Sequence, residues 1–95
     1  MRADPEINVY QSLVHLRPTF QDPSLVAYLI IKRLTRIAEI IDTAPGLERI
    51  ENGLVGGKVK IMYSCRLGPE EVNRFFSEQL VRLFSVESFE NYLME

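Results

Sequence analysis

The chain has 95 residues, enough for one domain and too few for two. Its composition, 46% hydrophobic and 25% charged, is typical of a globular protein and excludes a disordered segment. The net charge of −2 argues against a broadly basic surface for nucleic acid or anionic lipid, and no apolar run approaches the roughly 20 residues of a membrane span.

The single cysteine fits a reducing cytoplasm, or simply an unpaired buried thiol. Cys65 is the only cysteine, so no internal disulfide can form. The opening MRADPEINVY is charged and contains a proline, unlike the hydrophobic core of a signal peptide. We therefore expect a cytoplasmic protein with a single domain over residues 1–95, in which residues 1–6 form a loose lead-in and residues 7–93 fold.

The first strand is predicted over residues 7–16, INVYQSLVHL, which are rich in strand-forming residues. Alternation places two sets of side chains on opposite faces. One set is Tyr10, Ser12, Val14 and Leu16, and the other includes Ile7, Val9, Leu13 and His15.

The next segment, LVAYLIIKRL, is apolar enough for a buried strand, but its spacing favours a helix. Asp22 followed by Pro23 is typical of a helix start, with the aspartate as N-cap. We predict a helix from there to about Glu39. Its core stripe recurs every three or four residues and comprises Ala27, Ile30, Ile31, Leu34, Ile37 and Ala38.

Two strands and an irregular turn follow. EIIDTAP (39–45) reads as a short strand, and GLERIENG as an irregular or 3₁₀ turn with a bend at Asn52-Gly53. KVKIMYSC (58–65) alternates as a half-buried strand does. Its apolar face is Val59, Ile61, Tyr63 and Cys65.

A second helix is predicted from Pro69 through Phe84, because Pro69-Glu70-Glu71 suits a helix N-terminus. A last strand, SVESFENYL (85–93), closes the pattern. The predicted core stripe of the helix is Val72, Phe75 or Phe76, Gln79, Leu80 and Leu83, with Val81 off it.

The order β-α-β-β-α-β predicts the fold class. It is α+β, a ferredoxin-like open-faced sandwich with a four-stranded antiparallel sheet and two helices on one face. The other sheet face is then solvated or used for contacts.

We find no constellation of catalytic, cofactor-binding or metal-ligating residues. His15 is the only histidine and has no ligand at a suitable spacing, and Cys65 lies on the apolar face of its strand. The glycines at 53, 56 and 57 precede a strand, unlike a phosphate-binding loop. Tyr63 alone does not make an RNA-stacking platform. We predict no enzyme activity, cofactor, metal, nucleic acid or membrane partner.

The run AYLIIKRLTRIAEIIDTAPGLERIENG resembles the response-regulator-binding domain, the second domain, of the chemotaxis histidine kinase CheA. The residues that carry the resemblance are the aliphatic run from Ala27 to Ile31, Leu34, residues 38–41, residues 43–45 and residues 47–50. The likeness continues through residues 58–65, the helix start at 68–72 and the closing SVESFE, and so covers roughly residues 8–93. The chain departs from the family in the charge of its first helix, which carries Lys32, Arg33 and Arg36, whereas many relatives are strongly acidic.

The resemblance implies a non-catalytic docking module within a larger multidomain kinase. Its partner would be a CheY-like receiver domain, or the receiver of the methylesterase CheB. Holding the receiver near the phosphorylated histidine of another domain would raise its effective concentration for phosphotransfer. Binding should weaken once the receiver is phosphorylated.

The first helix has more apolar surface than one core contact can use, and we expect the excess to pack on the second helix or meet a partner. Tyr28 is an amphipathic anchor of the kind that interfaces favour. Two other function classes remain open: a small-molecule-binding regulatory domain of the same fold, and a module that homodimerises through the free sheet face. The candidate partner-binding residues are Leu25, Tyr28, Leu29, Lys32 and Phe75.

Overall fold

The computed structural model describes residues 7–17, 22–51, 53, 56–84 and 86–94, so the expected lead-in over residues 1–6 lies outside it. The sheet has the order β2-β3-β1-β4, and all neighbouring strands are antiparallel. Its strands are β1 (Asn8–Leu16), β2 (Ala38–Ala44), β3 (Lys58–Cys65) and β4 (Val86–Met94).

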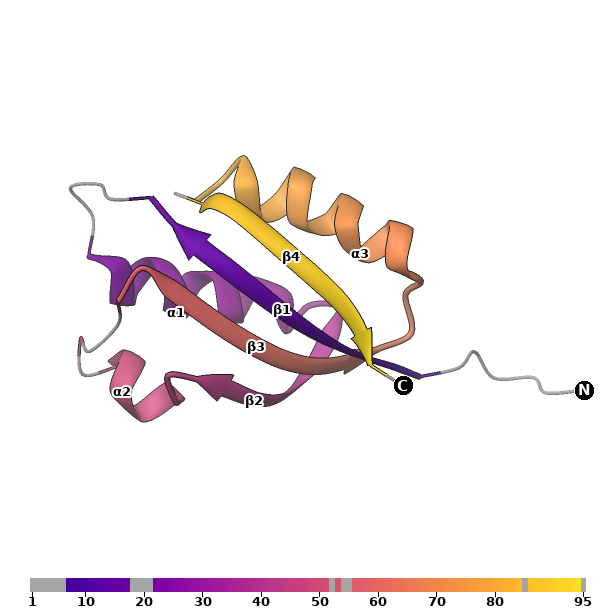
Figure 1. Cartoon of the computed structure of the whole chain (residues 1–95), viewed down its shortest axis with the longest axis horizontal. Helices are drawn as coiled ribbons and strands as arrows, with labels where there is room; N and C mark the ends of the chain where they lie inside the picture. The colour runs from indigo at the N-terminus through magenta and orange to yellow at the C-terminus, as the bar shows by residue number, and fades with distance from the viewer. Residues whose placement is uncertain (1–6, 18–21, 52, 54–55, 85, 95) are drawn as a thin grey trace, which may run out of the picture.

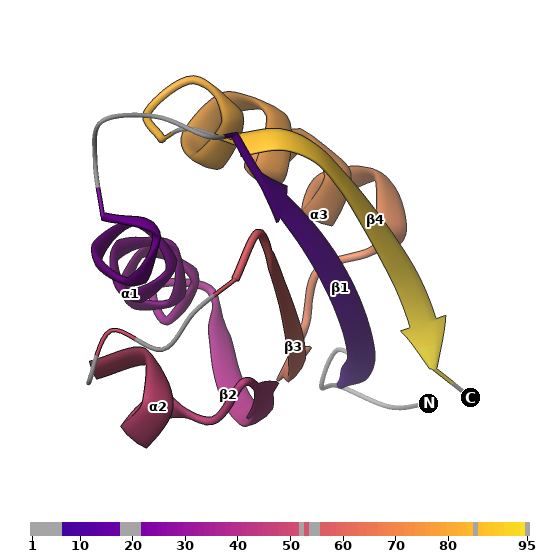
Figure 2. The same ribbon diagram turned by 60° about the vertical axis from the view of Figure 1, so that its left-hand side comes forward.

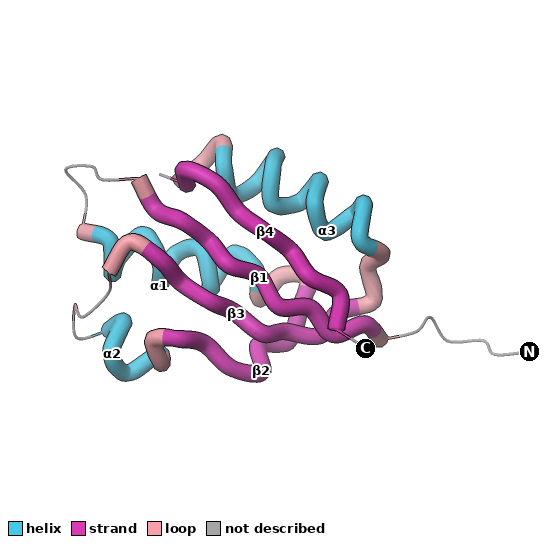
Figure 3. Tube along the Cα trace, in the orientation of Figure 1, coloured by secondary structure: helices cyan, strands magenta, loops and turns pink. Residues whose placement is uncertain are grey.

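The helices lie on one face of this sheet (Figures 1 and 2). They are α1 (Pro23–Leu34), the short α2 (Leu47–Glu51), which lies beside β2, and α3 (Pro69–Phe75), which continues as the π-helical η1 (Phe76–Val81). Figure 3 views the sheet from its other, open face, with α1 passing behind the strands and α3 seen alongside β4. The predicted ferredoxin-like fold is confirmed.

The core lies between the sheet and the helices, and alternation along the two central strands forms its floor. β1 pairs with β3 so that Tyr10 lies opposite Tyr63 and Val14 opposite Val59. The predicted core faces of both strands are confirmed, since Tyr10, Ser12, Val14, Leu16, Val59, Ile61, Tyr63 and Cys65 are all buried.

Aromatic rings connect the sheet to α3 and η1. Tyr63 stacks on Tyr10 with ring centroids 5.7 Å apart, and it also stacks on Phe76 with centroids 6.4 Å apart. The ring centroids of Phe76 and of Phe89 on β4 are 5.2 Å apart. Because aromatic rings bury large areas and prefer such offset contacts, this row fixes the second helix over β1 and β4.

A chain of hydrogen bonds crosses the same region and satisfies the polar groups that burial would otherwise leave unpaired. The Ser12 hydroxyl, fully buried, donates to Asn91 Oδ1 at 2.6 Å and therefore accepts from the Tyr63 hydroxyl at 2.8 Å. Asn91 Nδ2 donates in turn to Asn73 Oδ1 on α3 at 2.8 Å. The chain joins three strands and a helix.

The predicted end of the first helix was wrong by about one turn. α1 ends at Leu34, and β2 begins at Ala38, which pairs with Cys65. The turn between them closes by i→i+3 hydrogen bonds, from Arg36 N to Arg33 O and from Ile37 N to Leu34 O, both 3.1 Å. No glycine or proline marks this stop, so strand pairing overrides the helical spacing of Ile37 and Ala38.

The second helix also departs from its predicted stripe. Of the two alternatives left open, Phe76 is the fully buried residue and Phe75 is half-buried, whereas Leu83, predicted as core, is 54% exposed. Each π-helical turn of η1 contains more residues than an α-helical turn, so residues four apart in the sequence lie on the same side of the helix. Phe84 therefore takes the place predicted for Leu83 on the side that faces the core. Val81 is off the stripe as predicted.

The segment after β2 also differs in part from the sequence-based expectation. Residues 47–51 form a short α-helix, α2, rather than an irregular or 3₁₀ turn. Ile50 from this helix is buried in the core. Gly53 has φ +80°, which agrees with the predicted bend.

Replacing Phe76 by alanine should cost about 3–5 kcal/mol of unfolding free energy, because the fully buried ring is in contact with three others. The matched change Phe75→Ala, at the half-buried neighbour, should cost less than about half as much. Urea unfolding of the two variants measures both values, and equal losses would contradict the assigned phase of the helix.

Burial raises the pKa of Tyr63 far above its ordinary value of 10.0, and burial also raises the pKa of Tyr10. Above about pH 10 the unfolded chain releases tyrosine protons that the folded chain retains, so the free energy of unfolding should fall as pH rises. Tyr63→Phe should cost about 1 kcal/mol at pH 7 through the lost hydrogen bond. It should also flatten the alkaline decline, which unfolding measured from pH 8 to pH 11.5 would detect.

Candidate docking surface

The local sequence positions α1 firmly at its start. The Asp22 carboxylate accepts a hydrogen bond from the Ser24 backbone N–H at 2.9 Å, and Pro23 occupies the first turn, as predicted. The predicted core residues Ala27, Ile30, Ile31 and Leu34 are buried, and so is Val26, which the predicted stripe omitted.

Four of the five candidate partner-binding residues form one surface on α1, the α1 outer face, made of Leu25, Tyr28, Leu29 and Lys32. Leu25 is 53% exposed and Leu29 is 39% exposed, although both are large aliphatic side chains. Tyr28 is half-buried, and the Lys32 ammonium lies 6.0 Å from the centroid of its ring. The spacing of three and four residues makes these side chains neighbours on the helix surface.

Phe75 lies apart from this surface, on α3. Its ring is half-buried and makes an edge contact with Phe76, with centroids 6.3 Å apart. Among the described residues, the Phe75 ring contacts the ring of Phe76 and makes no ring contact with Tyr28. Ser24, one turn before Tyr28 on the same flank, has its hydroxyl beside Gly53, which follows α2 in the chain. The structure thus groups four candidates and separates the fifth.

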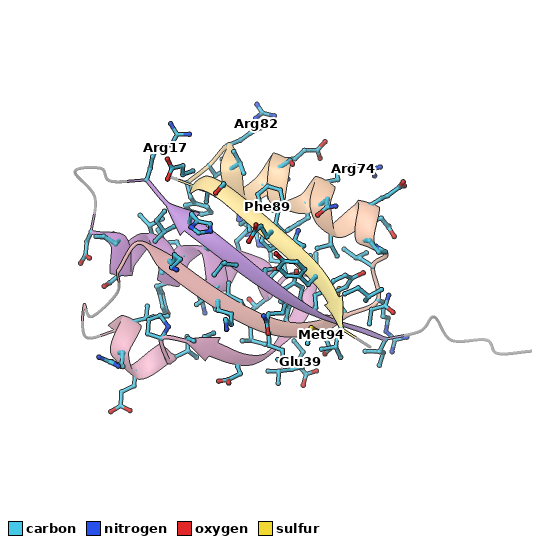
Figure 4. All side chains as sticks on the ribbon, viewed as in Figure 1. Arg17, Glu39, Arg74, Arg82, Phe89 and Met94 are labelled. Atoms are coloured by element: carbon cyan, nitrogen blue, oxygen red, sulfur yellow. The ribbon has the colours of Figure 1, made fainter. Side chains whose placement is uncertain are left out.

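A pocket of about 540 Å³ lies where α1 ends, β2 begins and β3 ends. Arg36, Arg66 and Glu39 contribute charges to it, and Ile37 and Leu67 contribute apolar surface. Figure 4 labels Glu39 at this end of the molecule. The pocket could not be predicted from the sequence, because its walls come from segments far apart in the chain.

The buried thiol Cys65 also lines this pocket. Burial raises its pKa, so the group stays a neutral thiol near pH 7 and is a poor nucleophile there. Among the described residues, no three histidine, cysteine or acidic side chains come together to hold a metal ion. The pocket thus combines charged and apolar side chains on its walls.

The open face of the sheet is a second exposed surface. Tyr92 is 51% exposed and Met94 is 40% exposed, and they lie opposite Gln11 and Val9 of β1. His15 lies on this face between Lys58 and Ser88. The face mixes charged, polar and apolar side chains, whereas the α1 outer face concentrates apolar groups beside one cation.

Comparison with solved structures gives a close match in fold. The structure of the "chemotaxis kinase CheA P2 domain in complex with response regulator CheY" from the thermophile Thermotoga maritima superposes with a TM-score of 0.82. The match covers 94% of this chain and 100% of that chain, at 19% sequence identity. No curated protein sequence matches the chain.

The helices of the described residues are too short or too polar for any of them to cross a membrane.

A family model, the P2 response regulator binding domain, matches residues 9–90. This range contains β2, β3, all the helices and the whole α1 outer face, together with β1 except Asn8 and β4 up to residue 90. The chain belongs to the P2 response regulator binding domain family.

Proposed function

We propose that this chain is the docking domain of a chemotaxis sensor histidine kinase, and that it binds a CheY-type receiver domain or the receiver of a CheB-type methylesterase. The family match over residues 9–90 carries the proposal. The fold shared with a CheA P2 domain solved together with CheY supports it.

In this role the domain contributes proximity rather than chemistry. A receiver held on a tethered module has an effective concentration of the order of millimolar near a phosphorylated histidine on another domain of the same kinase. A weak complex is then sufficient, and it releases its product quickly. The function requires a cytoplasmic location, which the unpaired thiol of Cys65 suits.

The α1 outer face is the surface that we propose for the contact. Leu25 and Leu29 supply apolar area that the fold leaves unused, and Tyr28 is a semi-rigid ring with a polar end. Phe75, half-buried on α3, would add to the edge of a larger contact. An area of this kind is typical of small, transient signalling interfaces.

Titration of the fluorescently labelled domain with a CheY-type receiver from the same organism tests the docking function. We expect roughly micromolar affinity for the unphosphorylated receiver and weaker binding once the receiver is phosphorylated. Absence of binding in both states, at concentrations about 100-fold above that affinity, would overturn the proposal. If the domain forms a dimer in the absence of the receiver, that result would favour the homodimerising alternative.

Substitutions of matched exposure test the surface. Leu25 and Ile41 are both 53% exposed, but Ile41 lies on the edge strand β2. Leu25→Ala should weaken receiver binding about three- to tenfold, because truncating an interface side chain loses buried apolar area. Ile41→Ala should leave the affinity within about twofold of the parent. Equal effects of the two substitutions on binding, measured by calorimetry, would place the contact elsewhere.

A further inference from the structure

The charges of the chain are segregated, and α1 carries one sign only. Residues 23–37 contain Lys32, Arg33 and Arg36 and no acidic residue, although the whole chain has a net charge of −2. The second helix is mixed: Glu70, Glu71 and Glu78 alternate with Arg74 and Arg82, which point outwards from it in Figure 4.

Cations near a helix C-terminus commonly serve the helix itself, by pairing with its last carbonyl groups. Here other donors already occupy those four carbonyls. Ile31 O accepts from Thr35 N at 3.1 Å, and Lys32 O accepts from the Thr35 hydroxyl at 2.5 Å. The carbonyls of Arg33 and Leu34 accept from the N–H groups of the next turn, both at 3.1 Å. The three cationic side chains are therefore not needed as caps.

The cations also form no ion pair among the described residues, although Arg36 lines the same pocket as Glu39. In the part of the chain that the structure describes, no carboxylate lies within ion-pair distance of Lys32, Arg33 or Arg36. The Lys32 ammonium lies over Tyr28, one turn towards the helix start, and so belongs to the α1 outer face rather than to the helix end. Three like charges within five residues repel one another, so an acidic partner would relieve that repulsion.

We infer that the receiver docked by α1 presents carboxylates around an apolar patch, and that Lys32 and Arg36 make the contact selective for such an acidic surface. This inference rests on the proposed docking function. Leu25 and Leu29 would meet the apolar centre, and the cations would meet the acidic rim. Rim charges of this kind mainly set the association rate, its salt dependence and the rejection of partners with like charge.

Charge reversal with a matched control tests the inference. The double variant Lys32→Glu/Arg36→Glu is compared with Lys58→Glu/Lys60→Glu, in which two exposed lysines of β3 are reversed on the open sheet face. Both variants change the net charge equally, so long-range effects are shared. The probe is the receiver domain of the CheY-type response regulator from the same organism, and thermal unfolding confirms that each variant is folded.

We expect the α1 reversal to weaken receiver binding by about tenfold or more, mainly through a slower association rate. The β3 reversal should remain within about threefold of the parent. Raising the salt from about 20 to 300 mM should weaken the parent and relieve the repulsion in the α1 variant, so that their affinities converge.

The outcomes separate this inference from the docking function. If the parent binds the receiver and the α1 reversal binds equally well or more tightly, docking stands and the acidic-partner inference is overturned. If both reversals weaken binding equally, the effect is one of net charge, and the inference is again overturned. If the parent does not bind at all, the docking function fails and the inference fails with it.

Discussion

The contact between Tyr63 and its neighbours is the interaction on which the rest of the domain depends. Its ring stacks with those of both Tyr10 and Phe76, and its hydroxyl donates to Ser12 inside the core. The ring thus brings the two central strands and the second helix together, while the hydroxyl begins a hydrogen-bond chain that reaches α3 through Asn91 and Asn73. Because every polar member has a partner, the burial costs little and the arrangement is specific.

This arrangement determines which surfaces remain for binding. With Phe76 committed to the core, the second helix covers β1 and β4, and α1 fills the remaining space with Ala27, Ile30, Ile31 and Leu34. The opposite side of α1 then faces outwards with Leu25 and Leu29 uncovered. A docking surface on a rigid helix needs no rearrangement, which suits a partner that must bind and leave quickly.

The sequence allowed the fold class and the strand faces to be predicted, because two-residue alternation and helix-start residues are local signals. It did not reveal the end of α1 at Leu34 or the π-helical turns after Phe75. Both depend on tertiary contacts, since Ala38 pairs with Cys65, and Phe76 packs between Tyr63 and Phe89. The apolar stripe alone could not distinguish Phe75 from Phe76, because both fit helical spacing.

The candidate surface was predictable in part. Helical spacing separated Leu25, Tyr28, Leu29 and Lys32 from the core stripe, and the structure groups these four side chains on α1. Spacing could not show how far Phe75 lies from them. The relative placement of α1 and α3 depends on how the intervening strands pair within the sheet. The pocket beside Arg36 gave no signal for the same reason.

We propose that a receiver docks on α1 rather than on the open sheet face. Backbone amide chemical shifts of the ¹⁵N-labelled domain, recorded during titration with the unphosphorylated receiver, test it most directly. We predict the largest changes at Leu25, Leu29 and Lys32, with small changes at Gln11 and Met62 on the open sheet face. Large changes at Gln11 and Met62, with α1 unaffected, would contradict it.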